Sequence, residues 1–139
     1  MNTSAVRTLH LDRNSTADDR TIDITTTGAR TRRPHRQEIW FYRAFDTTYL
    51  TGRPGPRDWY ANIIRNPALT LHLRKPAAVD IQATGRVIRD DSQRRRIFGA
   101  IIDDLLRSPN LQLEGPPPII EEWVAESRLV EITVTSLSA

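Results

Sequence analysis

The sequence predicts a mainly β, α+β fold. We expect about six antiparallel strands in a barrel or sandwich, with one short helix between strands and one amphipathic helix packed outside. Short segments in which apolar or β-branched residues alternate with polar ones recur six times, whereas a long helical period occurs once. The segments lack a regular strand, helix, strand rhythm, which argues against a doubly wound parallel sheet.

The first three strands should form a meander. Residues 21–27, TIDITTT, are β-branched and alternating, and the pattern stops at Gly28. Residues 35–45 predict a second strand of aromatic character. Asp46 then allows a turn into a third strand, which begins at Thr47.

A loop and a short helix follow the meander. Residues 52–57, GRPGPR, are dense in glycine and proline and predict a loop. Asp58 is a candidate N-cap for a helix over 59–66, and Pro67 limits that helix to about two turns.

Three strands complete the predicted sheet. Residues 69–73 alternate again, and 78–88 supply a long antiparallel partner after a turn at Lys75 and Pro76. The terminal strand is expected over 128–135.

The longer helix is predicted where the apolar period changes from two to about four. Asp90 and Asp91 precede it, and after Pro118 the sequence predicts one or two further helical turns. Its apolar side chains form two adjacent rows, which are Ile97, Ile101 and Leu105, and Phe98, Ile102 and Leu106.

Length and composition fit one domain. The chain has 139 residues and a mass of 15.9 kDa, with 38% hydrophobic and 27% charged residues. No apolar run approaches the roughly 20 residues needed to span a bilayer, and the polar start lacks the features of a secretory signal. We expect a cytoplasmic protein without integral membrane association, with a flexible lead-in over 1–20 and one cofactor-binding domain over 21–139.

Positive charge gathers in the middle of the chain. Between Gly28 and Lys75 there are ten basic and three acidic residues, a balance of +7, so the rest of the chain sums to −4 for a net +3. A basic segment of this kind is compatible with nucleic acid, an acidic lipid surface or a phosphorylated small molecule.

Several common sites are absent from the sequence. There is no cysteine, and His10, His35 and His72 are scattered without a metal-ligand spacing, so no metal site is expected. The chain also lacks the hydrolase elbow, the Walker loop and the dinucleotide-binding glycine motif. If the protein is an enzyme, the demanding chemistry belongs to a bound cofactor.

The segment from residue 21 to 74 resembles the deazaflavin-dependent nitroreductase and quinone reductase family, a branch of the split-barrel flavin/deazaflavin oxidoreductases. The resemblance lies in the order of TTTGARTRRP, an aromatic strand pair and DWYANIIRNPALTLHL. Its matching positions are Gly28, Arg30, Thr31, Pro34, Trp59, Tyr60, Asn62, Asn66 and Pro67. The chain departs from the family where Ala29 replaces a basic residue and where the loop over 51–57 is shorter.

The resemblance implies a split β-barrel that is commonly a homodimer and binds a small-molecule acceptor. The implied reaction is hydride transfer from the reduced deazaflavin coenzyme F(420) to a quinone-like or nitro-type acceptor. FMN is the alternative cofactor. A non-catalytic module that binds a phosphorylated or lipid-like ligand uses the same sequence features equally well.

The resemblance also implies where the cofactor lies. The loop after the first strand would hold its phosphate tail, and the loop that begins at Thr51 would lie beside its ring. The expected cofactor-binding residues are Thr26, Thr27, Gly28, Arg30, Thr31, Arg33, His35, Arg36, Thr51, Gly52, Arg53 and Trp59.

Elementary chemistry supports the phosphate end of this assignment. Arginines in a tight connection between paired strands supply charge-assisted donors, threonines add hydroxyl groups, and Gly28 lets backbone N–H groups approach an anion. Arg30, Arg33 and Arg36 are the leading anchors. Without the resemblance, the same arginines are better explained as a solvated hairpin tip.

No dedicated catalytic base is required, because hydride transfer needs mainly ring placement, with a proton from a tyrosine or from water. The candidate catalytic residues are Tyr49 and Tyr60, and Tyr42 is a further candidate proton donor or stacking partner. Each also fits a packing role, since Tyr42 and Tyr49 lie on predicted strands. Of Trp59 and Tyr60, one should point inward, and packing is favoured for Tyr60.

A nucleic-acid surface is a competing explanation of the arginines. Trp40, Phe41 and Tyr42 could stack on bases while the arginines follow the backbone. The basic residues concentrate at one loop and nearby element ends, however, and the remainder of the chain is net acidic. We therefore expect no nucleic-acid partner.

Overall fold

The structure is a computed structural model that describes residues 9–74 and 77–137. Within these residues, six strands and three α-helices follow a short 3-10 helix. In chain order the elements are η1 (Asp18–Arg20), β1 (Thr21–Thr27), β2 (Pro34–Ala44), β3 (Thr47–Thr51), α2 (Asp58–Arg65), β4 (Ala68–Leu73), β5 (Val79–Val87), α3 (Asp91–Arg107), α4 (Ile120–Glu126) and β6 (Leu129–Leu137).

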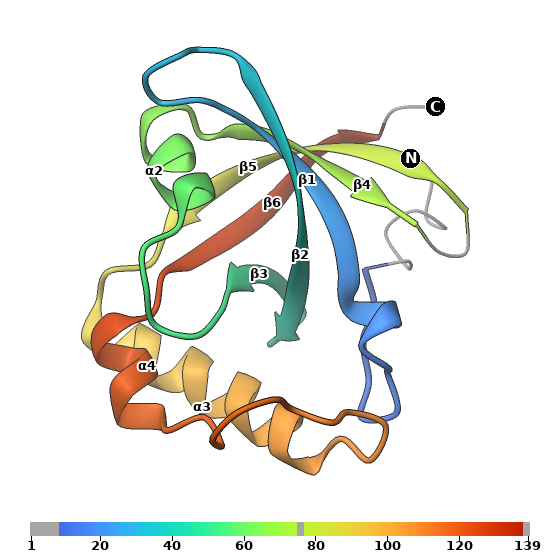
Figure 1. Cartoon of the computed structure of the whole chain (residues 1–139), viewed down its shortest axis with the longest axis vertical. Coiled ribbons are helices and arrows are strands. Elements are labelled where there is room, and N and C mark those ends of the chain that lie inside the picture. Colours follow the sequence, from blue (N-terminus) through green and yellow to red (C-terminus); the bar gives the residue numbers. More distant parts are fainter. Residues whose placement is uncertain (1–8, 75–76, 138–139) are drawn as a thin grey trace.

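The six strands close into an antiparallel barrel in the order β1, β2, β3, β6, β5, β4 (Figure 1). The predicted split-barrel fold and the meander of the first three strands are therefore confirmed. In β1, Ile22 and Ile24 are buried while Asp23 and Thr25 between them are partly exposed, as a half-buried strand requires.

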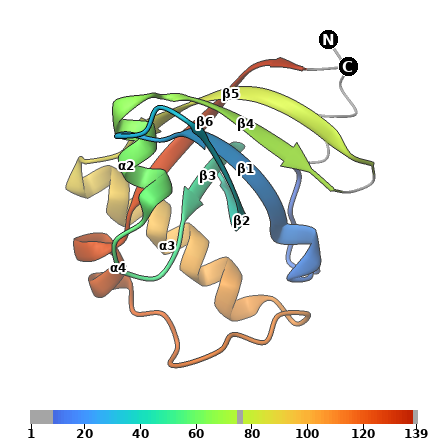
Figure 2. The same ribbon diagram turned by 45° about the horizontal axis from the view of Figure 1, so that its top comes forward.

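The helices cover two places on the barrel. Figures 1 and 2 show α2 beside the β1–β2 loop, and α3 with α4 packed together near the other end of the barrel. One hydrophobic cluster fills the barrel and includes Phe41, Leu50 and Trp59. A second lies between the strands and the helices and includes Phe98 and Trp123. Within the described residues, no helix is long and apolar enough to cross a membrane.

Three local predictions need correction. Asp58 is the first residue of α2, and Arg57 occupies the N-cap position without a side-chain hydrogen bond. Phe45 leaves the second strand, because Phe45 and Asp46 both have positive φ, 52° and 57°, and form the two-residue turn to β3. Leu106 is 56% exposed, because the buried stripe of α3 is narrower than predicted.

Part of the predicted flexible lead-in packs on the barrel. Leu9 belongs to the core of the barrel, and Arg20 is fully buried. The predicted turn at Lys75 and Pro76 lies outside the described residues.

Candidate functional site

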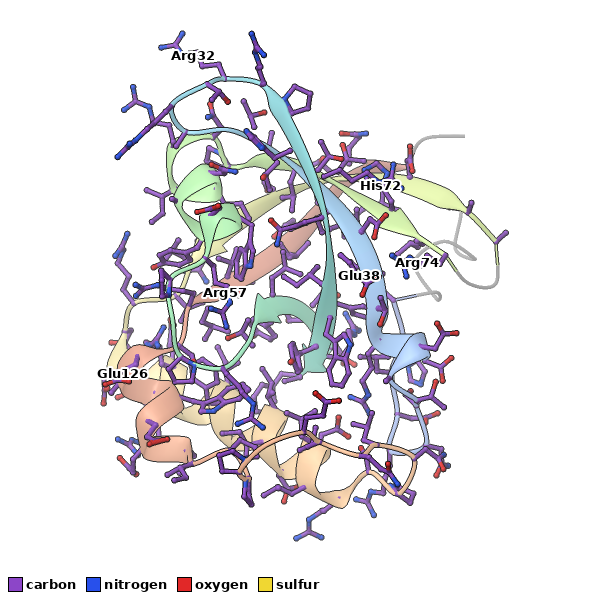
Figure 3. The ribbon with its side chains drawn as sticks, in the orientation of Figure 1. Arg32, Glu38, Arg57, His72, Arg74 and Glu126 are labelled. Atoms are coloured by element: carbon purple, nitrogen blue, oxygen red, sulfur yellow. The ribbon has the colours of Figure 1, made fainter. Side chains whose placement is uncertain are left out.

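The β1–β2 loop, residues 28–33, is closed by its own backbone. The Gly28 N–H donates to the Arg33 carbonyl at 2.8 Å, and the Arg32 N–H donates to the Gly28 carbonyl at 3.0 Å. A Cβ atom at Gly28 would lie 2.4 Å from Thr31 Oγ1 and 2.6 Å from His35 Nε2, so the loop is tight around this glycine. Figure 3 shows Arg32 at its outer tip.

Asn62 of α2 ties this loop to the barrel. Its Oδ1 accepts the Ala29 N–H at 2.9 Å, and its Nδ2 donates to Thr26 Oγ1 at 3.0 Å. The backbone N–H groups of Gly28 and Ala29 therefore already have partners within the chain. Thr26 is buried beneath the loop.

A pocket of about 560 Å³ lies between this loop and α2, and we call it the arginine pocket. It brings together five of the predicted site residues. Its lining consists of Gly28, Ala29, Arg30, Thr31, His35, Arg36, Gln37, Asp58, Ala61 and Asn62. Thr27 and Arg33 are not among these lining residues.

The arginines around the arginine pocket differ in how far they are already paired. Arg36 Nε donates to Asp23 Oδ2 at 3.0 Å, and Arg74 also donates to Asp23. Burial of Asp23 favours its neutral form, but these two guanidinium groups outweigh that effect and hold its pKa below the usual value. Among the described residues, the side chains of Arg30 and Arg33 have no hydrogen-bond or ion-pair partner, so their charge is available to an anion.

A second pocket, of about 400 Å³, lies where β2 meets α3, α4 and the segment before α4, and we call it the aromatic pocket. Its walls are mostly apolar, with two indole rings and a phenol ring. The lining residues are Ala17, Trp40, Tyr42, Arg53, Leu105, Gln112, Leu113, Glu114, Pro118 and Trp123. Trp40 was predicted only as a possible base-stacking residue, and no functional role was predicted for Trp123. Nothing in the local sequence marks the two as neighbours.

Tyr42 lies in the aromatic pocket with its side chain largely buried. Burial raises its pKa to about 12, and the positive charges of Arg20, Arg53 and Arg57 partly oppose that rise. The Tyr42 hydroxyl is therefore protonated near neutral pH. It has no hydrogen-bond partner among the described residues, so it can donate to a ligand.

The predicted ring-side loop runs between the two pockets. Arg53 lines the aromatic pocket and Asp58 lines the arginine pocket, five positions along a chain that can span at most about 18 Å. The loop is held in place, since Ser127 Oγ donates to the Gly52 carbonyl at 2.7 Å and Arg57 Nη2 donates to the Arg53 carbonyl at 2.7 Å. Thr51 is buried, and its hydroxyl donates to the Arg128 carbonyl.

The other predicted site residues lie outside both pockets. Trp59 is 2% exposed in the barrel core and presents almost no surface to a ligand on this chain. Tyr60 packs edge-on against Trp59, and the Arg128 guanidinium lies 5.3 Å from the centre of its ring. Tyr49 lies opposite Tyr42 in the β2–β3 register within the second cluster, and burial raises its pKa.

No protein-family model and no curated protein matches the chain. Solved structures do match it. A pyridoxamine 5′-phosphate oxidase-related, FMN-binding protein from Nostoc punctiforme is 17% identical with a TM-score of 0.62, over 96% of this chain and 80% of that one. An F(420) reductase is 17% identical with a TM-score of 0.58, over 86% and 90% of the two chains. A conserved hypothetical protein from Mycobacterium tuberculosis is 14% identical with a TM-score of 0.65, over 99% and 82%. At these identities the likeness shows a shared fold.

Proposed function

We propose that the protein is a split-barrel oxidoreductase that transfers a hydride from the reduced deazaflavin coenzyme F(420) to a quinone-like or nitro-type acceptor. One observation carries the proposal: the 52–58 loop connects a pocket with unpaired arginine charge to a pocket with aromatic walls. A cofactor whose anionic tail lies in the first pocket and whose flat ring lies along the loop, next to an acceptor in the second pocket, would use this combination. The solved F(420) reductase with the same fold adds support.

The residues of the arginine pocket fit a phosphate tail. Arg30 would bind it through charge-assisted hydrogen bonds, each worth about 1.5–3 kcal/mol. Thr31 and His35 would add polar contacts, since Thr31 Oγ1 and His35 Nε2 lie 3.1 Å apart and both residues line the pocket. Arg33 would supply charge from the edge of the loop, while Arg36 shares its charge with Asp23.

The flat ring would lie beside the 52–57 loop, as the family resemblance implies. When bound, the deazaflavin supplies the hydride, and the chain orients it and keeps water away from the acceptor. The apolar walls of the aromatic pocket serve that second task, since Leu105 and Trp123 are both buried. The acceptor would bind in the aromatic pocket.

FMN is the second candidate cofactor. It also combines a phosphate with a flat ring, and one solved protein with this fold is an FMN-binding protein. We further propose that the protein is a homodimer, for which the family resemblance is the support.

Equilibrium titration of the purified protein with F(420) and, in parallel, FMN tests this function. We expect the protein to bind F(420) selectively, and the affinity to fall with added salt because the tail is held by charge. Arg30→Ala combined with Arg33→Ala should remove about 2 kcal/mol of binding, which is about a 30-fold higher dissociation constant.

The double variant Arg13→Ala with Arg89→Ala is the matched control, because it removes the same charge from two exposed arginines outside both pockets. Its affinity should stay within about twofold of the parent protein. Equal affinity in the Arg30/Arg33 variant would remove the proposed phosphate anchor. Binding of FMN alone would change the cofactor, and binding of neither would favour a non-catalytic module.

A further inference from the structure

The walls of the aromatic pocket restrict the shape of its ligand. Trp40 comes from β2, Leu105 from α3 and Trp123 from α4, while Leu113 and Pro118 come from the segment before α4. An apolar cavity of about 150 Å³ already accepts benzene, so a pocket of about 400 Å³ has room for two fused rings. Large flat side chains favour a flat aromatic ligand.

The charge in the pocket restricts the chemistry of that ligand. Arg53 is the cation in the lining, and Nη2 of its guanidinium donates to the Glu114 carbonyl at 2.7 Å. The Arg53 side chain makes no other hydrogen bond to the described residues, so its remaining N–H groups are free to bind a ligand. Glu114 also lines the pocket, but it is an exposed residue and its carboxylate makes no ion pair with the described part of the chain.

Tyr42 adds a second unused donor. Its hydroxyl has no hydrogen-bond partner among the described residues, and three guanidinium groups, those of Arg20, Arg53 and Arg57, place positive potential on it. Because the hydroxyl is not fully buried, it can bind water in the free protein and can donate to a ligand that displaces that water. A neutral hydrocarbon would displace water from Tyr42 and Arg53 without replacing its hydrogen bonds, whereas an anionic oxygen would replace them.

We propose that the aromatic pocket binds a flat aryl carboxylate, with its rings between the indole and aliphatic walls and its carboxylate hydrogen-bonded by Tyr42 and Arg53. If this ligand is the electron acceptor, the inference rests on the proposed function and narrows the acceptor to flat aromatic acids. Binding of the aryl carboxylate itself does not require a bound cofactor.

Calorimetric titration of the cofactor-free protein with 2-naphthoate and 2-naphthamide tests the inference. The two probes share the ring system and differ in the charge of one group. We expect 2-naphthoate to bind at least about tenfold more tightly, and its advantage to shrink as salt is raised. Equal affinity for the two probes, or no binding of either, would overturn the proposal without any variant being needed.

Two variants assign the contacts. Arg53→Gln and Tyr42→Phe should each weaken 2-naphthoate binding, the first by about tenfold, and should leave 2-naphthamide binding within about twofold. Arg89→Gln, outside the pocket, is the control for Arg53→Gln and should change neither affinity. If both variants fold, as circular dichroism would report, and keep the full preference for 2-naphthoate, the assigned contacts are wrong.

A third titration separates this inference from the proposed function. Saturating F(420) should leave the affinity for 2-naphthoate within about threefold, because the acceptor and the coenzyme occupy different places. Competition between the two would overturn the assignment of the pocket to the acceptor. If F(420) does not bind while 2-naphthoate does, the reductase proposal fails and the aryl carboxylate site stands.

Discussion

Arg20 carries a full positive charge with no exposed surface. Its Nη1 pairs with Asp104 Oδ2 at 2.9 Å, and its Nη2 lies within hydrogen-bond distance of the Asp12 carbonyl, the Ser15 carbonyl and Ser108 Oγ. Its Nε has no partner among the described residues. A buried charge is costly unless it is paired. Because its partners lie both before β1 and at the end of α3, Arg20 fastens these two parts of the chain together.

Because Asp104 pairs with the buried Arg20, we expect substitutions at Asp104 and at its neighbour Asp103 to differ in how much they lower the free energy of unfolding. Asp104→Asn leaves the buried Arg20 without its counter-charge and should lower the free energy of unfolding by about 2 kcal/mol. Asp103→Asn breaks only an exposed pair with Arg107 on the same helix and should cost less than about 0.5 kcal/mol. Urea unfolding of both variants measures the difference, and equal costs would contradict the structural role given to Arg20.

At the scale of elements, α3 shows how one polar side chain starts a helix. The Asp90 carboxylate accepts the Gln93 N–H at 3.0 Å, which satisfies one of the unpaired donors of the first turn. The predicted position of Asp90 directly before the helix is confirmed, whereas Asp91, predicted to precede the helix as well, is its first residue. The same reasoning was wrong for Asp58, which lies inside α2 because Arg57 already has the extended backbone of an N-cap.

The cap on α3 should contribute measurably to stability. Asp90→Ala removes the acceptor for the Gln93 N–H and should cost about 1 kcal/mol. Ser92→Ala, in the exposed first turn and without a side-chain hydrogen bond to the described residues, is the control and should stay within about 0.5 kcal/mol of the parent. Thermal unfolding followed by circular dichroism compares them, and an unchanged stability in Asp90→Ala would argue against the cap.

Over the whole molecule, closure of the barrel separates residues that the sequence analysis treated as one site. Arg30 and Arg36 line the arginine pocket, whereas Arg53 lines the aromatic pocket. Trp40 and Trp123 line one pocket because α3 packs against both β2 and α4, although the two tryptophans lie in opposite halves of the chain. The two pockets therefore suit two ligands, the phosphate end of a cofactor in one and an acceptor in the other.

The proposed homodimer is a property of the whole molecule. Sedimentation equilibrium over a range of protein concentrations should give a mass of twice the 15.9 kDa chain. A single-chain mass at every concentration would contradict the proposal, and adding F(420) to the same samples would report whether the cofactor changes the assembly.

Much of the fold follows from patterns that involve residues a few positions apart. Alternation along β1, the apolar rows of α3 and the proline after α2 reflect local backbone and burial preferences, so these elements could be predicted. The loop after β1 was likewise identified by its arginines, since charge is visible in composition. The hydrogen bonds of the Gly28 and Ala29 N–H groups could not be predicted, because the acceptor for Ala29 is a buried asparagine, Asn62, on a helix far along the chain.

The membership of the aromatic pocket depends on contacts between distant segments. Strand alternation places Trp40 and Tyr42 on one face of β2, but no local signal joins them to Arg53 or Trp123. That proximity results from strand pairing around a closed barrel and from helix packing on it. Periodicity tells which side of an element is buried, but not which other element buries it. For this reason the order of strands and helices is readable from the chain, whereas the site arises only when the strands pair and the helices dock.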